Sequence, residues 1–249
     1  MSSSSVTVPS ATTPADPRTR LAVLPQPRHW ILWPVFGAVL IVLFGLLIKV
    51  ASGVTGAEIQ VDVWLSRNQD GFFGAIALTI DTVLSPAGNL VILVISFLFL
   101  LFARRSPVNA FAFTSVAAFG WLSSEAFKLI VAMPRPNGHL LQHPLLAEVG
   151  HDSFPSGHTT FAVSYAIAAV LLARRTRWAT LTTVVAILFA VLVAFSRLYV
   201  GAHYPSDVIG AFLVGFTAIA FYTGLWNRFG MIVLRRLTFL RRIGPVPAQ

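Results

Sequence analysis

Long apolar runs alternate with short polar connections along most of the chain. Each run is near the roughly 20 residues that a helix needs to span a bilayer, although the second and fourth are somewhat short. The pattern predicts an all-α integral membrane protein with a bundle of six transmembrane helices. These helices are expected at about residues 30–51, 87–103, 108–132, 157–173, 178–196 and 206–226.

The segment between the first two runs has a different pattern. Glu58, Asp62 and Asp70 precede its apolar part, and Asp81 lies within that part. An apolar stretch this short that carries an acid is unlike a spanning helix. After the first span we therefore expect an additional helix at residues 71–86, which either lies in the membrane interface or re-enters the membrane.

The two ends of the chain differ in composition from the predicted membrane domain at residues 29–227. Residues 1–28 are rich in Ser, Thr and Pro. Such a stretch buries little apolar surface, so we expect a disordered cytoplasmic tail. Residues 228–249 are expected to form a basic cytoplasmic tail. The central part of the domain, residues 88–226, carries the motifs considered below.

The composition supports a membrane protein and gives its orientation. Of 249 residues, 56% are hydrophobic and only 11% are charged, whereas a soluble domain carries about 25% charged residues. Thirteen of the 18 basic residues fall in the two tails and in the connections at 104–105 and 174–177. Basic residues collect on the cytoplasmic side, so both termini are expected there. This distribution explains the net charge of +9 without a nucleic-acid partner.

Three basic residues break this pattern. Lys128, Arg135 and Arg197 fall near helix ends on the opposite, extracytoplasmic face. Cations at the depth of the membrane boundary are costly and indicate a functional site. The pattern gives them no matching acids, which favours a multiply charged anion such as phosphate. Ser156 and Gly157 open a helix nearby, and free N–H groups at a helix start also favour an anion.

Two histidines are expected at the same face. His158 follows Gly157, and His203 precedes Asp207 by four residues. The acid can orient the His203 imidazole, an arrangement that suits nucleophilic catalysis. Cysteine is absent, so the chain has no Cys-based nucleophile or metal site. Together these residues predict phosphoryl transfer.

The motifs KLIVAMPRP, PSGH and SRLYVGAHYPSD resemble the three-part signature of the type-2 phosphatidic acid phosphatase superfamily. The resemblance covers roughly residues 88–226. It implies that His203 is the nucleophile, that Asp207 fixes its tautomer and that His158 protonates the leaving oxygen. The implied phosphate pocket consists of Lys128, Arg135, Ser156, Gly157 and Arg197. The resemblance implies neither a metal nor another cofactor.

The resemblance implies a plasma-membrane phosphatase whose partners are the bilayer and a lipid phosphate. Polyprenyl diphosphate, phosphatidic acid and phosphatidylglycerol phosphate are all compatible substrates, and relatives favour polyprenyl diphosphate, the carrier recycled in cell-wall synthesis. Two alternatives stay open, a lipid phosphotransferase with the same phosphohistidine and a non-catalytic anion-binding transporter. The oligomeric state is also left open.

Other polar residues of the outer loop are given ordinary roles. His139, His143 and His151 lie near Asp152, but their spacing is loose for zinc. We interpret them as loop histidines or substrate contacts. Glu125 is one turn before Lys128 and is expected to pair with it or to face a neighbouring helix.

Overall fold

The computed structural model describes residues 16–142, 145–146 and 148–247, and every regular element in these ranges is helical. The prediction of an all-α fold is confirmed. The elements are η1 (Pro17–Ala22), α1 (Leu32–Val50), α2 (Ser52–Arg67), α3 (Gly71–Val83), α4 (Pro86–Leu98), η2 (Phe99–Ala103), α5 (Pro107–Val131), η3 (Gly138–Leu140), α6 (Gly157–Ala173), α7 (Ala179–Tyr199), α8 (Pro205–Leu225), η4 (Trp226–Gly230), α9 (Met231–Arg236) and α10 (Leu240–Ile243).

Four helices among the described residues are long and apolar enough to cross a membrane. They are α1, the continuous helix Pro86–Ala103, α7 and the continuous helix Pro205–Arg236. The predicted span at α6 is apolar but has only 17 residues. The predicted span at α5 has 25 residues, but it carries polar groups such as Asn109, Glu125 and Lys128. A total of six spans therefore stays a prediction.

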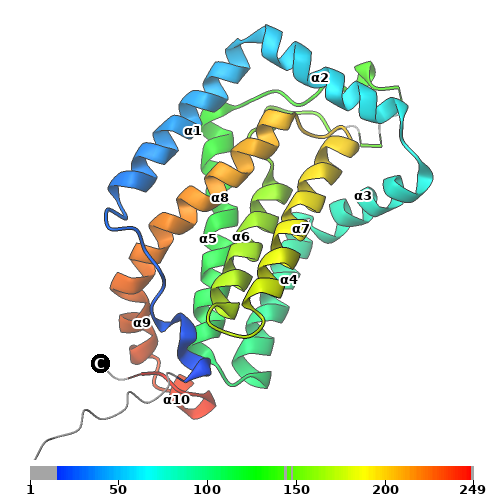
Figure 1. Cartoon of the computed structure of the whole chain (residues 1–249). Coiled ribbons are helices and arrows are strands. Elements are labelled where there is room, and N and C mark those ends of the chain that lie inside the picture. The colour runs from blue at the N-terminus through cyan, green and yellow to red at the C-terminus, as the bar shows by residue number, and fades with distance from the viewer. Residues whose placement is uncertain (1–15, 143–144, 147, 248–249) are drawn as a thin grey trace, which may run out of the picture.

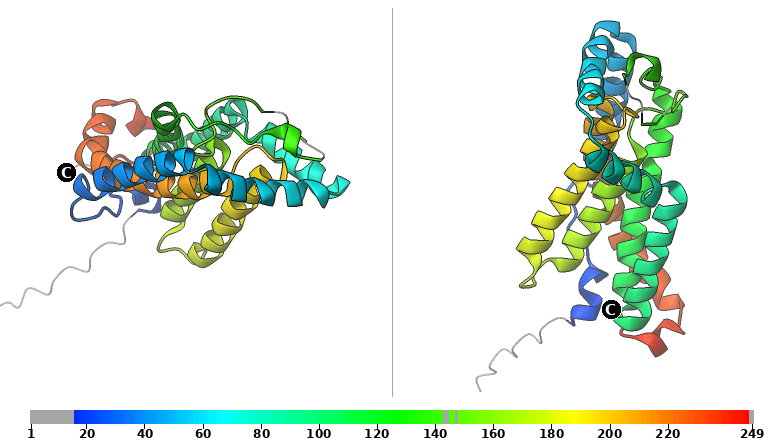
Figure 2. Two further views of the ribbon diagram at one scale, coloured as in Figure 1. Left: turned by 90° about the horizontal axis from the view of Figure 1, so that it is seen from above. Right: turned by 90° about the vertical axis from the view of Figure 1, so that its right-hand side faces the viewer.

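Helix α5 lies at the centre of the bundle. It packs against α4, α6 and α8, while α7 lies on α6 and α1 lies along α8 (Figure 1). Small residues permit close approach of these helices: an added Cβ at Gly120 of α5 would overlap the hydroxyl of Ser164 on α6. The end of α5, the start of α6, the end of α7 and the start of α8 consequently meet at one end of the bundle (Figures 1 and 2).

Two helices that do not meet the criteria for a span surround this end. Helix α2, which the sequence pattern did not separate from its surroundings, contacts α7 and α8. Helix α3 has 13 residues and packs mainly against α7. It occupies most of the stretch predicted as an interfacial or re-entrant helix, and its place in the membrane stays a prediction.

The expectation of a disordered tail at residues 1–28 is wrong for residues 16–28. Leu21 and Leu24 are 1% and 2% exposed, and Leu21 N donates to Asn109 Oδ1 at 2.9 Å. Trp226 Nε1 donates to Leu21 O at 2.9 Å. Two leucines within a polar, Pro-containing stretch thus anchor it to α5 and η4. Residues 1–15 lie outside the described residues.

The predicted boundary between the membrane domain and the C-terminal tail also differs from the structure. The last long helix continues past residue 228 to Arg236. Leu234 and Leu240 are buried in the same apolar cluster as Leu21. Alternating leucines among the arginines therefore pack this segment onto the end of the bundle that is opposite to the start of α8 (Figure 1).

Candidate active site

Two connections and four helix ends form the site. Helix α5 ends where Ala132 adopts the left-handed conformation, with φ of 46°, and the chain then turns back through Arg135. Ser153 N donates to Met133 O at 3.0 Å, which holds the start and the end of the long α5–α6 connection together. This connection lies against the first turn of α8, because Ser156 N donates to Asp207 O at 3.2 Å.

Asp207 organises both connections through one carboxylate oxygen. Its Oδ2 accepts hydrogen bonds from the Ser153 hydroxyl at 2.5 Å and from Tyr204 N at 2.9 Å. His203 Nδ1 lies 3.4 Å from the same oxygen. This is longer than a normal hydrogen bond, but it directs Nδ1 to a buried carboxylate. The other ring nitrogen, Nε2, is therefore the one that faces away from Asp207.

His203 Nε2 points toward the guanidinium of Arg135. It lies 3.5 Å from Arg135 Nη1. The imidazole is only 3% exposed. Burial lowers the pKa of His203 below its usual value, and the Asp207 carboxylate only partly offsets this effect. The imidazole is therefore neutral near pH 7, with a free nitrogen beside a guanidinium.

A cavity of about 540 Å³ opens beside these groups. Both histidines line it, together with Lys128, Arg135 and Gly157. The rest of the wall has an apolar part, which comes from α5 and from the residues around the start of α4, and a polar part. The apolar part consists of Leu84, Pro86, Trp121 and Leu122, and the polar part of Asn89, Glu125, Glu148 and Asp152. The cavity thus places cations and imidazoles next to an apolar surface.

Lys128 and the start of α6 form one side of this cavity. A Cβ at Gly157 would lie 3.2 Å from Lys128 Nζ, so glycine permits the ammonium to approach the first turn closely. Ser156 is the N-cap residue, but its hydroxyl caps no backbone N–H and instead accepts from Thr159 Oγ1 at 3.2 Å. The free N–H groups of α6 and the lysine therefore face the same region, which suits an anion.

The three motif cations have acidic partners, so the expectation of cations without matching acids is wrong. Lys128 Nζ lies 3.0 Å from Glu125 Oε1, which confirms the pairing expected from their spacing. Arg135 binds Asp152 at 2.9 Å and also forms an ion pair with Glu148. Since buried cations are costly without counter-charges, the acids stabilise the site. A phosphate that enters the cavity must compete with them.

Arg135 and Asp152 shift each other's pKa. The hydrogen bond from Arg135 lowers the pKa of Asp152 below its usual value. Burial lowers the pKa of Arg135, but Asp152 and Glu148 outweigh burial and hold it above its usual value. Both groups therefore stay charged across the neutral range.

Arg197 does not line the cavity but reaches it through Asp81. Its side chain is fully buried, and Nη1 lies 2.5 Å from Asp81 Oδ1. The same carboxylate oxygen lies 3.6 Å from His158 Nε2, while the Asp81 carbonyl oxygen lies 3.2 Å from that nitrogen. Asp81 on α3 thus connects Arg197 to His158.

The structure places all eight predicted site residues at one end of the bundle. Five of them line the cavity, while Arg197, Ser156 and Asp207 are buried behind it. Their catalytic and binding roles stay predictions. In the part of the chain that the structure describes, no group of three or more His, Asp or Glu residues could hold a metal ion. His139 and His151 lie in the α5–α6 connection, and His143 lies outside the described residues.

The sequence analysis did not predict that acidic residues contribute to the site. Asp81 was noted only as an acid within an apolar stretch, and that anomaly was the available signal. Glu148 and Asp152 lie in a polar connection, where an acid gives no signal of its own. Glu58, which accepts from Ser206 N and Oγ at 2.9 Å each, gave a similarly weak signal.

Comparison with known proteins identifies the class to which this site belongs. Residues 109–230 match the profile of the PAP2 superfamily, and this range includes all eight predicted site residues. The part of the chain that holds the site is therefore similar to the PAP2 superfamily. The resemblance drawn from the three motifs is confirmed.

Individual relatives are similar over shorter stretches. The undecaprenyl-diphosphatase BcrC of Bacillus subtilis is 37% identical over 86 residues, which are 34% of this chain and 42% of that protein. Phosphatidylglycerophosphatase B of Escherichia coli is 44% identical over 77 residues, or 30% of each chain. The matches thus span less than half of these two relatives.

A solved structure shares the fold. The crystal structure of a transmembrane PAP2-type phosphatidylglycerolphosphate phosphatase from Bacillus subtilis aligns with a TM-score of 0.65. The alignment covers 80% of this chain and 97% of that chain at 22% sequence identity. The two proteins therefore share the arrangement of their helices.

Proposed function

We propose that the protein is a metal-independent membrane phosphatase that hydrolyses lipid phosphates or diphosphates through a phosphohistidine on His203. The observation that carries this proposal is the orientation of His203. Its Nδ1 faces a buried carboxylate, and its Nε2 faces Arg135 and a cavity lined also by Lys128 and His158. A neutral imidazole in this setting has a lone pair directed at the place where cations would hold a phosphoryl group.

The proposed reaction has two steps. The Nε2 lone pair attacks phosphorus, and the bond to the leaving oxygen breaks as that oxygen takes a proton from His158. Asp207 stabilises the positive charge that develops on His203. Water then attacks the phosphohistidine, His158 accepts a proton from it, and the P–N bond breaks to release inorganic phosphate and neutral His203.

Cations supply the charge stabilisation that many phosphatases take from a metal. Lys128 and Arg135 line the cavity and can contact phosphoryl oxygens there. We include Arg197 in the phosphate pocket as the resemblance implies. In the structure Arg197 is bound to Asp81, so its direct contact with phosphate requires exchange of that carboxylate.

The apolar wall favours a lipid over a soluble phosphate ester. Leu84, Pro86, Trp121 and Leu122 supply this apolar part of the wall. A head group can thus reach His203 while the attached chain lies along these side chains. Relatives are named for undecaprenyl diphosphate, phosphatidylglycerophosphate and lipid A. Among the compatible lipids we favour a polyprenyl diphosphate.

We further propose that the site faces outward and that both termini are cytoplasmic. The 13 basic residues outside the site and α1–α3 belong to the two terminal segments and to the connections at the opposite ends of the helices. Such clustering is typical of a cytoplasmic face. In this arrangement α5 and α6 complete six spans, and α3 lies near the outer interface.

The test is release of inorganic phosphate by the purified protein in detergent. The substrates are undecaprenyl diphosphate, phosphatidic acid and phosphatidylglycerol phosphate, each with and without EDTA. We expect release from at least one lipid, unchanged by EDTA, and none from His203→Ala. Release that requires added magnesium would contradict the metal-independent mechanism. Transfer of label to a hydroxyl acceptor without free phosphate would identify a phosphotransferase, and binding without turnover a transporter.

A further inference from the structure

A second cavity lies at the opposite end of the helices. Its volume is about 520 Å³, and it is enclosed by η1, the end of α4, the start of α5, the end of α6 and the start of α7. Asn109 lines this cavity and Lys128 lines the candidate active site, and both lie on α5. At 1.5 Å per residue the two are about 28 Å apart, close to the thickness of a hydrocarbon core. The cavities therefore belong to opposite leaflets.

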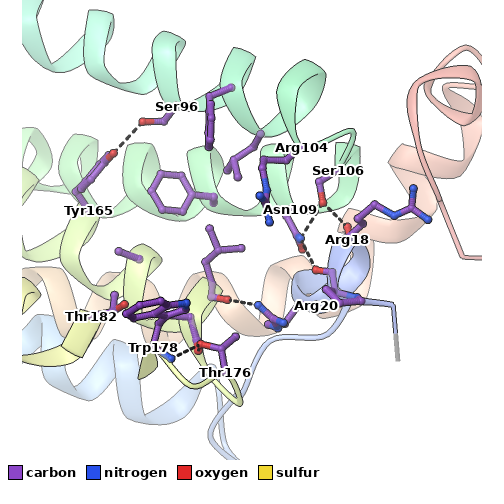
Figure 3. A pocket seen from close by; sticks show the side chains of 17 residues that line it. Arg18, Arg20, Ser96, Arg104, Ser106, Asn109, Tyr165, Thr176, Trp178 and Thr182 are labelled. Carbon is purple, nitrogen blue, oxygen red and sulfur yellow. Dashed lines mark hydrogen bonds between the residues drawn. The ribbon is translucent and has the colours of Figure 1, made fainter. Parts of the chain in front are cut away.

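The wall of the second cavity is basic. Arg18, Arg20 and Arg104 line it, and none of the described residues that line it is acidic. Figure 3 shows that the side chains of Arg20 and Arg104 extend toward the same space, whereas Arg18 points away. Arg18 forms an ion pair with Asp16 outside this space. No described residue forms an ion pair with Arg20 or Arg104, so two positive charges are available to an anion.

The rest of the wall is suited to an acyl chain. Phe99 and Leu100 of η2, Phe113 of α5 and Leu172 of α6 line the cavity. Its polar groups on this side are mutually satisfied, since the hydroxyls of Ser96 and Tyr165 lie 2.8 Å apart (Figure 3). Apolar side chains thus lead from the arginines toward the middle of the bundle. A molecule that fits both parts has an anionic head and an apolar tail.

Hydrogen bonds hold the basic side of the cavity in place. Asn109, 3% exposed, donates to Pro17 O at 3.0 Å and accepts from Leu21 N at 2.9 Å. The Ser106 hydroxyl donates to Arg18 O at 2.7 Å. These bonds fix the backbone of η1 beside α5, while Arg20 Nη1 donates to Leu172 O at 2.9 Å. Arg20 is thereby positioned before any ligand binds, which reduces the entropic cost of binding.

We propose that this cavity is a binding site for an anionic phospholipid of the leaflet opposite the candidate active site. The phosphate of the lipid lies between Arg20 and Arg104, and one acyl chain lies along Phe99, Phe113 and Leu172. The site is distinct from the catalytic cavity, since no histidine or acid among the described residues lines it. The lipid joins η1 to α4 and α6, so its binding stabilises the folded protein.

Native mass spectrometry of detergent-purified protein tests this proposal with phosphatidylglycerol, phosphatidylcholine and inorganic phosphate as probes. We expect the wild type to retain phosphatidylglycerol in preference to phosphatidylcholine. The double variant Arg20→Gln/Arg104→Gln should lose roughly 25-fold in affinity for phosphatidylglycerol, because each arginine near a lipid surface contributes about fivefold. Excess inorganic phosphate should not displace the lipid.

Two further variants keep the test decisive. Arg228→Gln/Arg241→Gln removes the same charge from the same end of the protein, outside the cavity, and should retain phosphatidylglycerol as the wild type does. Ala169→Phe leaves both arginines in place but fills the cavity, and it should also lose the lipid. An equal loss of affinity for phosphatidylglycerol in the Arg228/Arg241 control would mean that only the net charge matters, and it would overturn the proposal. Retention in both cavity variants, or displacement by inorganic phosphate, would also overturn it.

Discussion

Arg135 Nη1 lies 3.5 Å from His203 Nε2, so the guanidinium stands beside the imidazole nitrogen that is turned away from Asp207. A guanidinium at this distance disfavours protonation of the imidazole and is in reach of a phosphoryl group that bonds to it. The same contact therefore supports both a neutral nucleophile and a bound phosphate.

The first prediction is the pH dependence of kcat/KM. His203 reacts as a neutral imidazole, and burial lowers its pKa from the usual 6.5. Rate should therefore be lost only as the pH falls below about 6.5, the unperturbed value for histidine. Asp207→Asn removes the carboxylate that raises this pKa, so the acidic limb should shift to lower pH. The variant should also lose about 10³- to 10⁴-fold in kcat, because the tautomer is no longer held. An acidic limb above pH 7 in the wild type would contradict this assignment.

The second prediction concerns competition between Glu148 and phosphate for Arg135. The Glu148 carboxylate is bound to Arg135, which lines the catalytic cavity. Glu148→Gln should lower the inhibition constant of inorganic phosphate about fivefold, as expected for loss of a partly exposed ion pair. Asp16→Asn is the matched control, because it breaks the Arg18 ion pair at the other end. Unchanged or weaker inhibition in Glu148→Gln would mean that the two anions do not compete.

The third prediction concerns Asp62 on α2. Burial, followed by the Asp207 and Glu58 carboxylates, raises the pKa of Asp62 to about 8, and neither oxygen has a hydrogen-bond partner among the described residues. Since the folded-state pKa is the higher one, this group costs stability increasingly as pH rises from about 4 to about 8. Asp62→Asn should raise the free energy of unfolding at pH 9 by at least about 1 kcal/mol, and by less at pH 5. Thermal unfolding in detergent at both pH values measures this. Equal effects at the two pH values would exclude titration of Asp62.

The fourth prediction is the topology. The chain has no cysteine, so single cysteines report without background. Asn137→Cys lies in the exposed connection at the candidate site, and Arg175→Cys lies in the exposed turn between α6 and α7. An impermeant thiol reagent should label the first in intact cells and the second only after lysis. The reverse pattern would place the site in the cytoplasm.

The sequence was sufficient to predict the long apolar helices and the motif residues around the cavity, but it did not predict η1, α2 or the ion pairs of the site. Apolar length predicts a helix, and the three motifs lie at helix ends that must meet if the helices alternate in direction. The Asp81–Arg197 contact joins residues 116 positions apart. Asp81 meets Arg197 only because α3 packs on α7. The order of residues 16–28 likewise depends on Asn109, which satisfies the backbone of η1. No short stretch of the sequence predicts either contact.

The central claim is that His203 carries the phosphoryl group, and rapid-quench labelling tests it most directly. Wild-type and variant proteins are mixed with a ³²P-labelled lipid phosphate, quenched within milliseconds and analysed for acid-labile, base-stable label. We expect label on the wild type and on His158→Ala, which retains the nucleophile but loses the acid, and no label on His203→Ala. Label that persists on His203→Ala but is absent from His158→Ala would contradict the account and exchange the roles of the two histidines.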